Sequence, residues 1–85
     1  RAGEINLRGG DKAGAMDRIE ATYRSRGADI DRLDGVTVSF PDWWFNVRPS
    51  NTEPLLRVNI ETDTPEQLEQ AKAEVLSLIE PDSRS

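Results

Sequence analysis

Two alternating apolar runs on either side of a short polar loop constrain the fold of this chain most. The apolar residues are Phe45 and Val47 before the loop and Leu56, Val58 and Ile60 after it. Successive side chains of a strand point to opposite faces of a sheet, so each run can bury one face of a β-strand. The pattern predicts two neighbouring strands that share a core face, with the polar residues 48–54 at an edge of the sheet.

The same alternation predicts a second, polar face on these two strands. Its residues are Trp44, Asn46, Arg48, Arg57, Asn59 and Glu61. In a chain of one domain nothing covers this face, and we expect it to carry an exposed tryptophan. Trp43 and Trp44 are adjacent, so one should join the core while the other is available for docking.

The loop itself reads Arg48-Pro49-Ser50-Asn51-Thr52-Glu53-Pro54. A phosphate dianion offers several acceptor oxygens, and it is well held by a planar guanidinium together with hydroxyl and amide donors. Such donors come from Arg48, Ser50, Asn51 and Thr52. Asn, Ser and Pro are also ordinary turn formers, so a plain hairpin connection accounts equally well for the composition of the loop.

Two further strands complete the predicted sheet. Residues 4–8 alternate until Gly9-Gly10, and residues 36–40 alternate until Pro41-Asp42 turns the chain. Residues 29–35 contain several aspartates at a spacing like that of a calcium loop. Leu33 and Phe40 nevertheless stand where calcium ligands are needed, so calcium binding is not expected.

Two amphipathic helices are predicted. Asp11 should cap the first, which stops at Gly27, and its charged residues, Arg18 among them, are expected to form a solvated face. The second helix begins at Thr64-Pro65-Glu66-Gln67, a capping-box spacing with proline in the first helical position, and Pro81 ends it. The order β-α-β-β-β-α predicts a two-layer α+β fold, with two helices on one face of a mainly antiparallel four-stranded sheet.

Composition limits the possible functions. The 85 residues suffice for one domain, which we place at residues 1–80, followed by a flexible tail at 81–85. The net charge of -5 and the absence of cysteine suit a cytoplasmic protein, and no segment resembles a membrane span or a signal peptide. An acidic chain is a poor partner for nucleic acid. Without histidine or cysteine, a self-contained hydrolase or zinc site is not expected.

The segment Trp44–Arg57 resembles the phosphate-binding signature in the C-terminal, fourth domain of the α-D-phosphohexomutases, most closely the bacterial phosphomannomutase/phosphoglucomutase group. Residues 3–6 resemble the opening of the same domain, and residues 33–38 resemble the start of its second strand, so the likeness covers nearly the whole chain. The resemblance implies the same layout, with a fold similar to that of TATA-binding protein, and it allows one further short strand.

The resemblance also implies a function. In this family, the arginine, serine, asparagine and threonine of the loop hold the sugar phosphate that is not being transferred, and these roles fall on Arg48, Ser50, Asn51 and Thr52. Glu53 and Arg57 would be supporting residues, with Glu53 orienting a nearby arginine.

The whole enzyme moves phosphoryl between the 1- and 6-positions of mannose or glucose phosphate. Its phosphoserine, its magnesium loop and its sugar-reading loop lie in other domains, and none of those motifs occurs in this sequence. The domain would therefore have no cofactor of its own, would work together with the other domains, and would be inactive alone. The alternative is a stand-alone module that binds a phosphopeptide or RNA.

Overall fold

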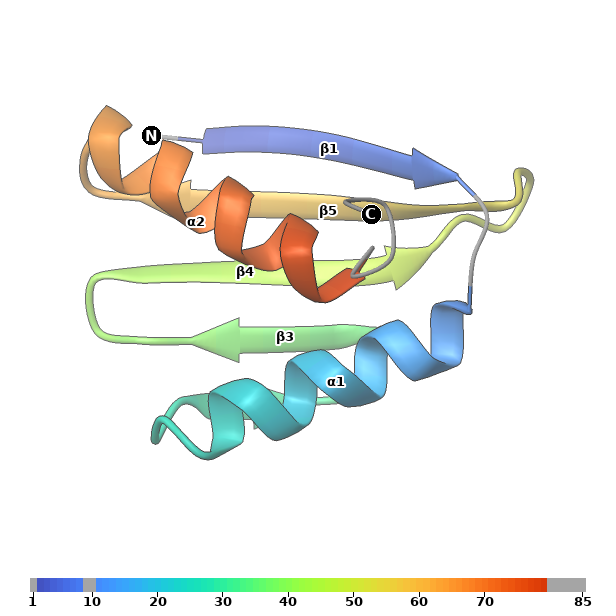
Figure 1. Cartoon of the computed structure of the whole chain (residues 1–85), viewed down its shortest axis with the longest axis horizontal. Helices are drawn as coiled ribbons and strands as arrows, with labels where there is room; N and C mark the ends of the chain where they lie inside the picture. Colours follow the sequence, from blue (N-terminus) through green and yellow to red (C-terminus); the bar gives the residue numbers. More distant parts are fainter. Residues whose placement is uncertain (1, 9–10, 80–85) are drawn as a thin grey trace.

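One antiparallel sheet and two helices make up the part of the protein that the structure describes. The computed structural model describes residues 2–8 and 11–79. Its elements are β1 (Ala2–Arg8), α1 (Lys12–Arg24), β2 (Asp29–Asp31), β3 (Val36–Ser39), β4 (Trp43–Pro49), β5 (Leu55–Thr62) and α2 (Pro65–Ile79). The strand order is β1-β5-β4-β3-β2, and both helices lie on the same face of the sheet (Figure 1). The predicted two-layer α+β fold is confirmed.

The predicted number of strands is wrong, because the sheet has five strands and not four. The additional strand is β2, which pairs antiparallel with β3 through Ile30 and Val38. It has three residues, and Ile30 is the one apolar residue between two exposed aspartates. Local alternation is therefore too short to reveal it, and pairing with β3 is what makes this segment extended. The family resemblance allowed for such a strand.

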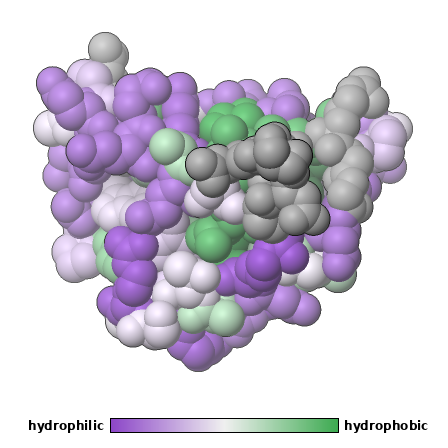
Figure 2. Space-filling view, viewed as in Figure 1, coloured by the Kyte–Doolittle hydropathy of each residue, from purple (hydrophilic) through white to green (hydrophobic). Residues whose placement is uncertain are grey.

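The core lies between the sheet and the two helices. Phe45, Val47, Val58 and Ile60 are each at most 1% exposed, and Leu56 is 2% exposed, so the predicted shared face is confirmed. α1 contributes Ala15, Ile19 and Tyr23, and α2 contributes Leu68, Ala71, Val75 and Ile79. Seen from the helix side, the surface is largely hydrophilic, with small apolar areas near its middle (Figure 2).

The ends of α1 follow the sequence closely. The side chain of Asp11 accepts a hydrogen bond from the Gly14 backbone N–H at 3.0 Å, as the predicted N-cap should. At the other end, Gly27 has a φ of +83°, and the Ala28 N–H donates to the Tyr23 carbonyl at 3.1 Å. These are the features of a Schellman motif, in which a glycine in the left-handed region ends the helix.

The start of α2 is a variant of the predicted capping box. The Gln67 N–H donates to Thr64 Oγ1 at 3.1 Å, which is the first half of the box. The Gln67 side chain accepts from the N–H of Asp63 at 3.1 Å, one residue before the cap. The first bond satisfies a backbone donor that a helix start leaves without a partner, and the second fixes the residue before the cap against the first turn of α2.

The prediction that Arg18 lies on a solvated face is wrong. Its Nε donates to the carbonyl of Leu78 at 2.9 Å, and an Nη donates to the carbonyl of Ile79 at 3.3 Å. The last carbonyls of a helix have no partners within it and carry partial negative charge. Arg18 therefore joins α1 to the end of α2, a role that sequence spacing could not reveal across 60 residues.

Tyr23 provides a second link between the helices. Its ring is fully buried, and its hydroxyl donates to Glu74 Oε1 at 2.6 Å, while Arg26 donates to the same oxygen at 2.9 Å. Burial, followed by the bond to Glu74, raises the pKa of Tyr23 well above its usual value. The hydroxyl consequently stays protonated as a donor, and the charged acceptor stays paired.

None of the helices in the described ranges is both long and apolar enough to cross a membrane. The predicted strand end at Gly9-Gly10, the helix end at Pro81 and the tail at 81–85 lie outside the described residues.

Candidate functional site

The predicted polar loop joins β4 to β5 at one end of the sheet. The Ser50 N–H donates to the Leu55 carbonyl at 2.9 Å, which closes the hairpin. The Ser50 hydroxyl oxygen accepts from the N–H of Thr52 at 3.3 Å, so this serine also shapes the turn. Asn51 and Thr52 are exposed. The segment is a hairpin connection in geometry, and this leaves open whether it also binds a ligand.

Several donors in the loop have no acceptor within the described part of the protein. The side chains of Asn51 and Thr52 make no hydrogen bond there, and the Ser50 hydroxyl is used only as an acceptor. A hydroxyl can accept and donate at once, so Ser50 keeps one donor available. The loop therefore presents uncharged donors to solvent.

Arg48 lies at the end of β4, on the face of the sheet opposite the helices. Its Nη1 is 3.3 Å from Asp34 Oδ2, and its side chain is 41% exposed. Its Nε and Nη2 have no partner among the described residues. No hydrogen bond in that part of the chain joins the Arg48 side chain to Ser50, Asn51 or Thr52. The predicted site residues therefore share one segment and one end of the sheet without bonding to one another.

A second arginine lies directly across the hairpin. Arg48 is paired in register with Arg57 of β5, so the two side chains project from the same face. Nη2 of Arg57 is 3.1 Å from Glu4 Oε2 on β1. Like charges placed directly opposite each other on neighbouring strands repel. Each arginine is held from its outer side by a carboxylate, which leaves the pair able to take an anion.

Within the described residues, the Glu53 side chain forms no hydrogen bond or ion pair with either arginine. In the region that the structure covers, Arg48 pairs with Asp34 and Arg57 pairs with Glu4, and the Glu53 side chain makes no ion pair. That Glu53 orients a nearby arginine when a ligand is bound stays a prediction.

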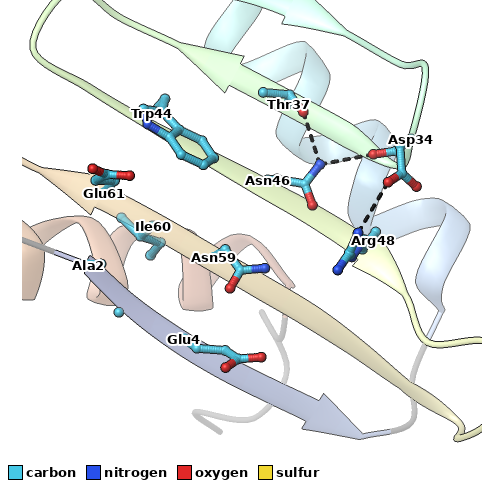
Figure 3. Close-up of a pocket in the computed structure, with 11 residues that line it drawn as sticks. Ala2, Glu4, Asp34, Thr37, Trp44, Asn46, Arg48, Asn59, Ile60 and Glu61 are labelled. Atoms are coloured by element: carbon cyan, nitrogen blue, oxygen red, sulfur yellow. Dashed lines mark hydrogen bonds and ion pairs between the residues drawn. The ribbon is translucent and has the colours of Figure 1, made fainter.

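Asp34 and Asn46 are the residues that sequence reasoning missed. The sequence analysis placed Asp34 in the calcium-like run and in the family-like segment 33–38 but gave it no role in the site, yet its carboxylate faces Arg48 from the turn between β2 and β3 (Figure 3). Nδ2 of Asn46 donates to the Asp34 carbonyl and to Thr37 Oγ1, both at 2.9 Å. The described residues contain no group of three or more acidic side chains that could hold a metal ion.

A shallow groove extends from this site along the open face of the sheet (Figure 3). Its volume is about 690 Å³, and its side chains include Trp44, Asn46, Arg48, Asn59 and Glu61. The predicted second face is therefore confirmed, and Trp44 is 40% exposed on it. Trp43 instead packs against the core, which confirms the opposite placement of the two tryptophans.

Comparison with known proteins places the chain in a family. The model of the phosphoglucomutase/phosphomannomutase C-terminal domain matches residues 4–78. A phosphomannomutase of Escherichia coli is 44% identical over 79 residues, and one of Methanocaldococcus jannaschii is 38% identical over 78 residues; each match covers 92% of this chain. A probable phosphoglucosamine mutase of Methanopyrus kandleri is 37% identical over 68 residues, which are 80% of this chain and 15% of that protein.

Solved structures agree on the fold. A phosphoglucomutase/phosphomannomutase family protein of Burkholderia thailandensis superposes with a TM-score of 0.70 at 23% identity, over 96% of this chain and 18% of that one. The chain spans 17% of the length of the Escherichia coli and Methanocaldococcus relatives.

Proposed function

The chain belongs to the phosphoglucomutase/phosphomannomutase family, in which it corresponds to the C-terminal domain, and we propose that it holds the non-transferring phosphate of a hexose phosphate. The proposed ligands are Arg48, Ser50, Asn51 and Thr52, with Glu53 and Arg57 in supporting roles. The whole protein would transfer phosphoryl between the 1- and 6-positions of mannose or glucose phosphate in the cytoplasm. Phosphoserine and magnesium would be supplied by its other domains, as the family resemblance implies.

One observation carries this proposal. Arg48 keeps Nε and Nη2 without a partner in the described region, next to a loop whose hydroxyl and amide donors are also unused. Charge-assisted hydrogen bonds from a guanidinium to phosphate are among the strongest that a protein makes. Neutral donors add further bonds at a small desolvation cost.

A grip on the distal phosphate can assist a reaction that occurs elsewhere on the sugar. Binding energy at a non-reacting group can hold the reacting oxygen in line with the phosphoryl donor. Ser50, Asn51 and Thr52 recognise the phosphate and little of the ring in this arrangement. Either end of a hexose bisphosphate could therefore occupy the same loop, as exchange between the two positions requires.

The open face speaks against the RNA alternative. Trp44 could stack on a base, but Glu61 is its direct neighbour in register, and Asp34 and Glu4 line the same groove. Carboxylates around the aromatic platform would repel a phosphate backbone, whereas RNA binding needs an extended basic surface.

Amide chemical shifts of this chain test the proposal. Glucose 1-phosphate should shift the amides of Arg48, Ser50, Asn51 and Thr52, with a dissociation constant in the millimolar range or weaker, because a few charge-assisted bonds act alone. A phosphopeptide and an oligonucleotide at the same concentration should bind no more tightly. Shifts confined to the helices, or tighter binding of either competitor, would contradict the assignment.

A further inference from the structure

We propose that Asp34 is a positioning residue that acts through Arg48, holding one side of the guanidinium so that its other side faces the phosphate at residues 50–52. The inference rests on the proposed function and assigns a role to a residue outside the loop. Asp34 would not touch the phosphate itself.

The backbone of Asp34 is fixed against β4. Gly35 has a φ of +69°, and a Cβ at this position would lie 2.2 Å from the Val47 carbonyl oxygen and 2.7 Å from Arg48 Cβ. The turn therefore approaches β4 as closely as a residue without a side chain allows. In addition, the side-chain amide of Asn46 on β4 donates a hydrogen bond to the Asp34 carbonyl at 2.9 Å. Two independent contacts thus place the carboxylate beside Arg48.

The ion pair uses only part of the guanidinium. Nη1 of Arg48 lies 3.3 Å from Asp34 Oδ2, while Nε and Nη2 have no partner in the described residues. A guanidinium is planar, so fixing one nitrogen restricts the directions in which the others point. The unpartnered nitrogens form the edge that a phosphate can receive.

A role in stability explains this arrangement poorly. The Asp34 side chain is 72% exposed, and exposed ion pairs contribute little to folding. Removing its negative charge would by itself favour an incoming dianion. A positioning role predicts instead that removing Asp34 weakens phosphate binding. Without Asp34, Arg48 rotates freely and must lose more conformational freedom when it binds.

The experiment compares Asp34→Ala, Asp34→Asn and Glu61→Gln in this chain, with glucose 1-phosphate as the probe. Asp34→Ala should weaken binding about two- to fivefold, the range expected for an exposed ion pair. Asp34→Asn keeps one acceptor oxygen and should fall between this variant and the wild type. Glu61→Gln removes a charge from the same face, and Glu61 forms no ion pair with an arginine among the described residues. The dissociation constant of this variant should change by less than about 1.5-fold, because salt screens distant charges.

The Nε–H signal of Arg48 gives a readout that a merely structural role would not move. It should shift or broaden in unliganded Asp34→Ala, while the amide signals of both helices and the melting temperature stay as in the wild type. Equal or tighter binding by Asp34→Ala would overturn the positioning role alone. Unresponsive loop amides in the wild type would instead overturn the proposed function.

Discussion

The two faces of the sheet differ in burial and in charge, although the same strands supply both. On the helix side, apolar residues such as Phe45 and Val47 are fully buried, and no buried side-chain polar atom in the described residues lacks a partner. On the open side, Arg48 and Arg57 are only partly neutralised, and Trp44 is exposed. The difference indicates that the helix side provides stability, whereas the open side is where we propose binding. Mutations on the two faces should therefore change different properties.

Neighbouring residues of β4 give the largest contrast. Phe45→Ala should cost about 3 to 5 kcal/mol, because it removes a fully buried aromatic side chain. A domain of this length has a total stability of roughly 4 to 12 kcal/mol, so this variant should be largely unfolded or close to it. Trp44→Ala, one residue away on the open face, should cost less than about 1 kcal/mol. Denaturant melts measure both changes, and similar losses would contradict the division between the faces.

Two glycines with positive φ, Gly35 in the turn before β3 and Gly27 at the end of α1, provide a second comparison. Gly35→Ala places a Cβ against the backbone of β4 and should cost roughly 2 to 4 kcal/mol, from backbone strain and steric overlap together. Gly27→Ala has a similar φ but no atom within 4 Å of the added Cβ. It should cost about 1 kcal/mol from backbone strain alone. Equal melting temperatures would show that the turn does not pack on β4 as described.

The helix side should respond to pH through Tyr23. Its pKa is raised in the folded protein, so the bond to Glu74 stabilises the fold fully below the ordinary tyrosine pKa of about 10 and is lost progressively as the pH rises above it. Tyr23→Phe should cost about 1 kcal/mol at pH 7, since Glu74 keeps its bond to Arg26. The variant should also lose the part of the alkaline destabilisation that belongs to this residue. Unchanged alkaline melts would show that Tyr23 does not carry it.

The sequence predicted those parts of the fold that depend on local pattern. The alternation around Phe45 and Ile60 placed the two sheet faces correctly, and Asp11 and Thr64 located both helix starts. Contacts between distant segments were not predictable in this way. β2 needs β3 to become a strand, Arg18 reaches a helix end 60 residues away, and Asp34 meets Arg48 only after β3 and β4 have paired.

In the candidate site, too, local sequence reveals some residues but not their distant partners. Arg48, Ser50, Asn51 and Thr52 form one continuous segment, so their donor chemistry can be recognised from residue types alone. Their partners cannot, because Asp34 and Glu4 come from separate elements of the sheet. Glu53, the acidic partner expected from the family resemblance, makes no ion pair in the described part of the protein.

Arg48→Lys in the full-length protein, assayed for the proposed phosphohexomutase activity, tests the central claim most directly. The ammonium keeps the charge but loses the planar pair of donors, so kcat/KM should fall by about tenfold to a hundredfold, while the melting temperature stays within about 1 °C of the wild type. The matched control is Arg24→Lys, an exposed arginine paired with Glu20 on the helix side, which should leave both quantities unchanged. Unchanged kcat/KM for Arg48→Lys at subsaturating substrate would contradict the account and leave the loop as a plain hairpin connection.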